Sequence, residues 1–257
     1  MKKYFLSFGL LLTVSLATVV FNSCGKDDDS GNGSNNYYSD GKRISKFLFY
    51  GYPKSEINLG QPSYEWNFSY DDNGRISKYT EDNRVYDYTY KSDMIEVRRS
   101  GEDKDDYRYS TYLLNEKGFV KDDGGVYTYN NNNEMIKVVN THKGVNTTNI
   151  VWASGNMIRV EEGKYYCTIE YTDKENKAGV SEFLIRPGLQ FGLPFGKRTK
   201  NLPLRIEEDN GYSNTVAIFD YEFDGDGYVT KIITRGNGYN GHPKPDYKNP
   251  ILIFEYE

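Results

Sequence analysis

Cysteine and histidine are scarce in this chain, which has two of each among its 257 residues. Cys167 is the only cysteine beyond Cys24, so the part of the chain after the N-terminal segment cannot form an internal disulfide. A zinc site built from several histidines and cysteines lacks its ligands. Because Cys167 alternates in phase with Ile169, we expect it in the core, whereas His142 and His242 lie in turn-like segments.

An excess of positive charge is also missing. The 32 lysines and arginines stand against 37 acidic residues, which gives a formal net charge of −5. Binding to nucleic acid requires basic side chains that neutralise the phosphate backbone. We therefore expect no nucleic-acid partner.

Motifs for cofactors and metals are absent as well. The GxGxxG string at 236–241 is followed by prolines where a phosphate-binding helix should begin. Asp224 and Asp226 resemble the start of a calcium loop, but Arg235 occupies the position of the final glutamate. The sequence predicts no cofactor, no metal site and no catalytic residue.

The chain does have a recognisable N-terminal segment. Lys2 and Lys3 precede an uncharged and mostly apolar run at 4–21, after which Ser23 stands directly before Cys24. This order resembles the signal peptide of a Gram-negative lipoprotein, so we expect cleavage before Cys24 and lipidation of its thiol. The alternatives are a transmembrane anchor or plain secretion. The serines and threonines within the run and the absence of a basic cluster after it oppose the anchor.

An acidic run follows the cysteine. Lys26 precedes Asp27, Asp28 and Asp29. A lysine and acidic residues directly after a lipidated cysteine resemble the export signal that displays lipoproteins on the outer face of the outer membrane in some Gram-negative anaerobes. The simpler interpretation is a solvated spacer.

These features divide the chain into three parts. Residues 1–23 form the signal peptide, and residues 24–41 form a tether too rich in Gly, Asn and Asp to bury apolar surface. Residues 42–257 form one β-sheet domain. We expect a lipid-anchored protein of the outer membrane, displayed at the cell surface or, alternatively, held on the periplasmic face.

Tyrosine is the residue in excess, with 25 copies. Tyr favours pleated, half-buried surfaces, where its ring packs and its hydroxyl stays near water. At 64–70, aromatic residues alternate with Glu65, Asn67 and Ser69, which predicts a strand with all its aromatics on one face. Asp-Asp-Asn-Gly at 71–74 then supplies a turn, and 75–79 returns as the second strand of a hairpin.

The same hairpin pattern recurs along the chain. Aromatic strands lead through Gly-, Asn- or Asp-containing turns to returning aliphatic residues, which are Ile76, Ile95, Val120, Ile136, Ile158 and Val229. Consecutive hairpins pair side by side, which predicts one antiparallel meander of about fifteen strands. A sheet of that width must curl or close, so we expect an all-β half-barrel or barrel-like shell.

One segment interrupts the repeat. Residues 187–203 place leucines and phenylalanines between prolines and glycines, and are predicted to be neither helix nor strand. We expect an irregular apolar loop that plugs one end of the curled sheet. A loop that gates a ligand is the alternative.

The hairpin repeat resembles the tyrosine-aspartate repeats of Rhs-type shell proteins. The segments 196–203 and 221–232 resemble more closely a family of secreted lipoproteins of Gram-negative gut anaerobes, a domain of unknown function described as having a porin-like fold. This resemblance implies a curved meander sheet. It implies no activity and no functional residues.

Three functions remain open on the sequence. The first is a non-catalytic envelope protein that binds a glycan or an envelope protein through exposed Tyr and Trp faces. The second is a purely structural envelope protein, and the third is a hydrolase with loop-borne carboxylates such as Glu161 and Glu162. A membrane porin is opposed by the polar outward positions of strand 64–70, because membrane barrels present an apolar outer band.

Overall fold

The computed structural model describes residues 41–51, 53, 55–56, 58–101, 108–140, 145–185, 192–236 and 249–257. Cys24, the acidic run after it and both histidines lie outside these residues. The strands are β1 Ile44–Tyr50, β2 Tyr64–Tyr70, β3 Ile76–Glu81, β4 Arg84–Tyr90, β5 Met94–Ser100, β6 Arg108–Leu114, β7 Val120–Asp122, β8 Gly125–Tyr129, β9 Met135–Asn140, β10 Asn146–Ala153, β11 Asn156–Glu162, β12 Tyr165–Glu175, β13 Asn201–Asp209, β14 Asn214–Phe223, β15 Val229–Gly236 and β16 Ile251–Tyr256. Two short helical turns interrupt them, a 3₁₀ turn at Lys177–Gly179 and α1 at Glu182–Ile185.

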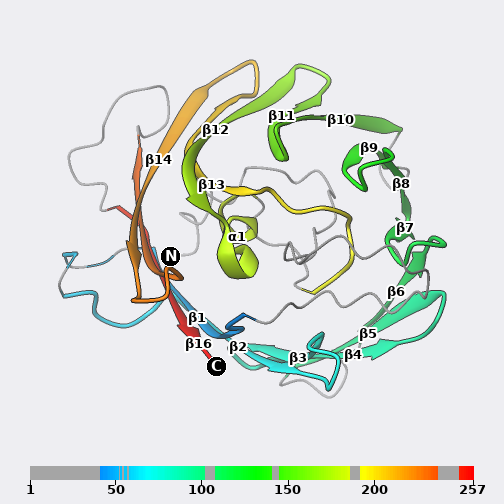
Figure 1. Cartoon of the computed structure of the whole chain (residues 1–257), viewed down its shortest axis with the longest axis horizontal. Helices are drawn as coiled ribbons and strands as arrows, with labels where there is room; N and C mark the ends of the chain where they lie inside the picture. Colours follow the sequence, from blue (N-terminus) through cyan, green and yellow to red (C-terminus); the bar gives the residue numbers. More distant parts are fainter. Residues whose placement is uncertain are drawn as a thin grey trace.

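The sixteen strands form one closed antiparallel barrel in which each strand pairs with its neighbours in the sequence. Closure comes from β1 and β16, whose register places Phe47 opposite Phe254. Figure 1 shows the ring of strands, with α1 inside it. The predicted barrel-like meander is therefore confirmed, and the sheet closes completely.

Four hairpin turns at one end of the barrel share one geometry. They cover 71–75, 115–119, 130–134 and 224–228, and in each the side-chain oxygen of the first residue accepts hydrogen bonds from backbone N–H groups two and four residues later. The fourth residue has a positive φ, and it is Gly in three turns and Asn133 in the other. The Asp or Asn at the start of each turn thus accepts the backbone hydrogen bonds, and the Gly or Asn at its fourth position allows the positive φ.

Tyrosine hydroxyls link neighbouring strands at this same end. Tyr90 of β4 donates a hydrogen bond of 2.9 Å to the carbonyl oxygen of Ile76, the first residue of β3. Five other tyrosines bond in the same way to a carbonyl near the start of the preceding strand, namely Tyr70, Tyr129, Tyr171, Tyr221 and Tyr256. On β10 the indole of Trp152 takes this place and donates to Met135. Much of the tyrosine excess is therefore structural.

Inner and outer faces alternate as the strand pattern predicts. The inner face carries the core, which includes Phe68, Tyr79 and Cys167. One outward row runs across four strands through Ser69, Lys78, Asp87 and Arg98. On these four strands the outward row is polar and charged, whereas a membrane barrel presents an apolar outer band to lipid.

The segment that interrupts the repeat fills the barrel, as predicted, over its described part. Just before this segment, Phe183 of α1 also belongs to the core, with its ring centroid 4.5 Å from that of Phe47 and 5.3 Å from that of Phe254. Leu193 and Phe195 are completely buried. The interpretation is wrong for 201–203, which belong to strand β13, and it did not foresee α1.

Backbone hydrogen bonds attach this segment to successive hairpins. The N–H of Val120 donates to Pro194, the N–H of Lys197 donates to Asn133, and the N–H of Lys200 donates to Gly155. We call the end of the barrel closed by 192–200 the plug end. The opposite end, formed by the turns at 82–83, 123–124, 163–164 and 210–213, is called the far end.

Among the described residues, no helix has the length and apolar character needed to cross a membrane.

Candidate functional site

The inner face differs between the two ends of the barrel. At the plug end it is aliphatic and aromatic and covered by 192–200. At the far end it carries part-exposed aromatic side chains and a set of polar side chains, of which Thr148 and Glu208 are buried. These far-end residues face inward because they alternate in phase with core residues on their own strands. They form the candidate binding site, in two groups on opposite arcs of the ring.

The first group, which we call the aromatic wall, comprises Tyr64 and Trp66 of β2 and Tyr86 of β4. All three side chains are part-exposed. The Tyr64 and Trp66 ring centroids are 5.5 Å apart, and Trp66 stacks on Phe47 at 4.7 Å. Tyr86 stacks on the buried Tyr79 at 4.2 Å. The aromatic wall is therefore backed by the core and presents fixed ring surfaces.

A carboxylate accompanies the aromatic wall. The Tyr86 hydroxyl donates a hydrogen bond of 3.3 Å to Oε2 of Glu81, the last residue of β3. Burial, and then the Glu81 charge, raise the pKa of Tyr86 above its usual value. Tyr86 is therefore a neutral hydrogen-bonding group at physiological pH.

The second group, the polar wall, comprises Thr148, Glu162, Tyr165, Glu208 and Thr215 on β10 to β14. Thr148 donates a hydrogen bond of 3.0 Å to Oε2 of Glu162. The hydroxyl of Thr215 donates a hydrogen bond of 3.4 Å to Oε2 of Glu208. Figure 1 shows that β10 to β12 lie across the ring from β2 to β4, so these parts of the two walls belong to opposite arcs of the closed barrel.

Glu208 is the most perturbed acid of the polar wall. The residue is 7% exposed, and burial raises the pKa of its carboxyl to about 7. The neighbouring Tyr165 hydroxyl and the hydrogen bond from Thr215 oppose the shift. Burial, and then the Glu208 charge, raise the pKa of Tyr165. The sequence analysis did not single out Glu208, although its alternation with the buried Ile206 placed it inside.

The carboxylates of the polar wall belong to one arc of the barrel. Glu162 and Glu208 lie on one arc, with β12 between their strands, and do not face each other across the barrel. Glu161, the partner of Glu162 in the predicted pair, points outward and pairs with Arg159 at 2.5 Å. The two adjacent acids are thus separated by the sheet, as the period of two requires.

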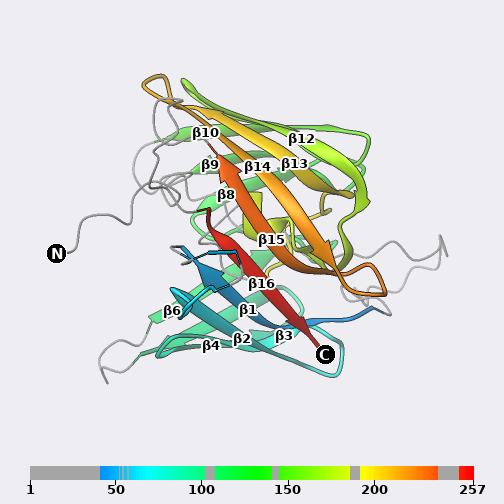
Figure 2. The ribbon, with the colours of Figure 1, turned by 90° about the vertical axis from the view of Figure 1, so that its left-hand side faces the viewer.

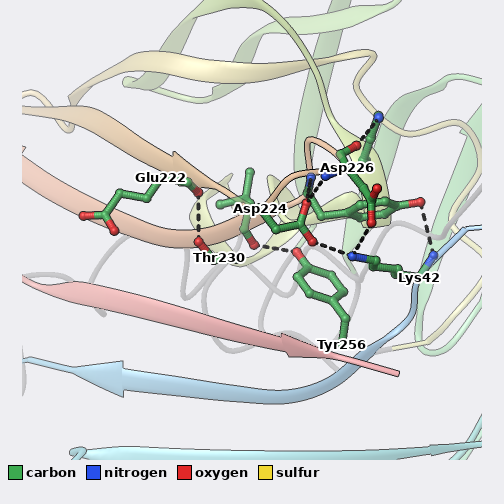
Figure 3. Close-up of polar contacts among 9 residues, drawn as sticks. Lys42, Glu222, Asp224, Asp226, Thr230 and Tyr256 are labelled. Carbon is green, nitrogen blue, oxygen red and sulfur yellow. Dashed lines mark hydrogen bonds and ion pairs between the residues drawn. The ribbon is translucent and has the colours of Figure 1, made fainter.

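The remaining sequence candidates have structural roles or lie outside the described residues. Cys167 is buried in the core, as predicted. Asp224 and Asp226 hold the Lys42 ammonium, so the stretch that resembles a calcium loop is a turn (Figure 3). Among the described residues, no group of His, Cys, Asp and Glu is arranged to hold a metal ion. The structure does not describe Cys24 or the lysine and aspartates of 26–29.

Comparisons with known proteins give a consistent picture of the fold. No family model matches the chain, and no curated protein matches it. A crystal structure of a porin-like protein from Bacteroides uniformis superposes with a TM-score of 0.56 and 14% identity, covering 83% of this chain and 96% of that one. A second, from Bacteroides vulgatus, gives a TM-score of 0.50 and 16% identity, covering 84% and 99%. The chain therefore has the fold of these porin-like Bacteroides proteins.

Proposed function

We propose that this protein is a non-catalytic envelope lipoprotein that binds a glycan at the far end of its barrel, between the aromatic and polar walls. The observation that carries the proposal is the contrast between the two ends. At the plug end, the inward tyrosines of six strands are committed to strand-linking hydrogen bonds. At the far end, Tyr64, Trp66 and Tyr86 keep part of their ring surface accessible.

The chemistry of the two walls suits a sugar. Aromatic ring faces pack against the apolar C–H face of a sugar ring, and a small number of placed polar groups fix its orientation. In the polar wall, Glu162 and Thr215 are part-exposed and offer a carboxyl and a hydroxyl of this kind. We therefore favour a glycan over a protein partner, which remains the second ligand class.

Location and anchoring belong to the same proposal. The signal peptide, lipidation at Cys24 and display at the outer membrane rest on sequence features alone. The fold likeness to porin-like Bacteroides proteins supports an envelope role. The acidic run at 27–29 supports display at the cell surface.

The test is a glycan array followed by fluorescence titration. Trp66 and Trp152 are the two tryptophans of the chain, so Trp152→Phe leaves Trp66 as a single reporter in the proposed site. We expect a glycan hit whose binding changes Trp66 emission and is weakened at least tenfold by Trp66→Ala. Tyr109→Ala is the matched control, because Tyr109 is 71% exposed on the outer face.

Each other outcome selects a different function. Binding that Tyr109→Ala weakens and Trp66→Ala does not would place the ligand outside the barrel. Capture of an outer-membrane protein without a glycan hit favours the protein partner, and no binding of either kind favours the purely structural role. Cleavage of an array glycan into shorter products would support the hydrolase and contradict a non-catalytic function.

A further inference from the structure

The chain enters the barrel at the plug end, where its first described residues are held by the β14–β15 turn. The Lys42 ammonium lies 2.7 Å from Oδ2 of Asp224 and 2.7 Å from Oδ2 of Asp226. The backbone N–H of Lys42 donates a hydrogen bond of 3.1 Å to the Tyr228 hydroxyl. Figure 3 shows Lys42 between the two aspartates, with Tyr256 of the last strand beside them. We call these contacts the entry lock.

The entry lock is built on a rigid turn. The second oxygen of Asp224 accepts the backbone N–H groups of Asp226 and Tyr228. The ammonium groups of Lys42 and Lys177 lie 5.4 and 5.3 Å from the centre of the Tyr228 ring. The side-chain hydrogen bond to Asp224 is the main cause that raises the pKa of Lys42 above its usual value.

Backbone hydrogen bonds connect the entry lock to the place where β1 and β16 close the barrel. Arg43 and Glu257 exchange two N–H···O bonds, of 3.2 and 2.9 Å, beside the start of β1. The path by which the chain joins the barrel is therefore fixed at the plug end, on the side of the β14–β15 turn. Figure 2 shows that β1 starts and β16 ends at the same end of the barrel.

We infer that the plug end faces the membrane and that the aromatic and polar walls open away from it, so that the ligand is a soluble glycan of the surrounding medium. The inference rests on the lipid anchor at Cys24 in the proposed function. A strand of ten residues such as β14 spans about 33 Å. Because the chain joins the barrel at the entry lock, a lipid on Cys24 is on average closer to the plug end than to the far end.

The structure of the plug end also agrees with its placement next to the membrane. Residues 192–200 fill the plug end and bond to the hairpins there, so a lipid headgroup at that end meets a closed surface. At the far end, Tyr64, Trp66 and Tyr86 are part-exposed, so a ligand can reach their ring surfaces there. This arrangement favours a soluble glycan over a headgroup of the anchoring membrane as the ligand.

Energy transfer in proteoliposomes tests this orientation. The full-length lipidated protein, with Cys167→Ser, receives one labelled cysteine, either Asn73→Cys in a plug-end turn or Tyr212→Cys in a far-end turn. Both residues are exposed. With acceptor dye on the lipid headgroups, we expect clearly higher transfer from position 73 than from position 212. Soluble glycan identified on the array should bind the anchored and the free protein with the same affinity.

A reversed attachment provides the control. Cys24→Ser protein with a histidine tag inserted in the 210–213 turn, held on chelating lipid, should show the opposite order of transfer. Equal or inverted transfer in the lipidated protein, or loss of glycan binding on anchoring, would overturn the inference. Absence of fatty-acid labelling and of membrane association would instead mean that the proposed lipid anchor is wrong.

Discussion

The Tyr221 hydroxyl on β14 donates a hydrogen bond of 2.5 Å to the carbonyl oxygen of Pro203 on β13. Burial raises the pKa of this tyrosine far above its usual value. Five other tyrosines make the same contact with the preceding strand around the plug end. Removing this hydrogen bond should lower the free energy of unfolding.

Tyr221→Phe should lower the free energy of unfolding by about 1 kcal/mol, the net value of one hydrogen bond whose acceptor stays buried. Urea denaturation measures this change. Tyr212→Phe is the control, since Tyr212 is 97% exposed and should give no measurable change. Equal stability of Tyr221→Phe and the natural protein would show that the hydroxyls contribute nothing beyond ring packing.

Gly196→Ala tests the attachment of the plug. Gly196 has a φ of 87°, and a methyl group there would run into the carbonyl oxygen of Asn133. We expect a loss of about 2–5 kcal/mol, the sum of a left-handed backbone and a forced displacement. Gly163→Ala separates the two causes, because Gly163 has a φ of 59° with open space around it and should lose only about 1 kcal/mol. Similar losses for both variants would mean that the plug yields to the added group.

Glu208 predicts a pH dependence of stability. Its pKa is raised from 4.5 to about 7 in the folded state, so the folded protein holds the proton more tightly than the unfolded chain. Its stabilising contribution is complete below about pH 4.5 and is lost as the pH rises to 7. Between these values, we expect a loss on the order of 2–3 kcal/mol.

Glu208→Gln should abolish this loss, which unfolding curves at pH 5 and pH 8 would measure. Glu207→Gln is the control on the outward face. Hydrogen bonds from Asn214 and Arg205 lower the pKa of Glu207, so its contribution is present above its unfolded pKa and is lost as the pH falls. An unchanged slope in Glu208→Gln would assign the pH dependence to another group.

Cys24→Ser should block lipid attachment and cleavage by the lipoprotein pathway, because only the thiol accepts the diacylglyceryl group. Metabolic labelling with a fatty-acid analogue measures this, and the folding of 42–257 should not change. Label that persists in the serine variant would contradict the lipoprotein assignment.

Replacing Asp27, Asp28 and Asp29 by Ala should leave lipidation intact and reduce display at the cell surface. Protease digestion of intact cells measures display. Digestion equal to that of the natural protein would show that the acidic run is only a spacer.

Much of the fold could be predicted because its signals are local. The alternation at 64–70 places Phe68 inside and Asn67 outside, and the Asp-to-Gly turns define the hairpins. The four-residue helix α1 could not be foreseen, since its sequence Glu-Phe-Leu-Ile fits a strand equally well. Contacts of Phe183 with aromatic residues from distant strands determine its conformation.

The candidate site was predicted only in outline. Tyrosine content indicated half-buried ring surfaces, but the division between strand-linking and accessible tyrosines depends on where each strand ends in the barrel. Tyr90 and Tyr86 share one strand and one face, yet one bonds to Ile76 while the other lines the far end. Strand register across the barrel decides this, and no local pattern reveals it.

The pairing of β1 with β16 has a consequence for how the chain folds. The other fifteen strand pairs of the ring join strands that are neighbours in the sequence, but this closing pair joins residues about two hundred positions apart, for example Phe47 and Phe254. Until β16 has been synthesised, both β1 and β15 present unpaired backbone edges, which invite pairing with other chains. Non-local pairing of this kind is slow. The completed ring has no free edge. Aggregation through strand edges is therefore expected only before β16 pairs with β1.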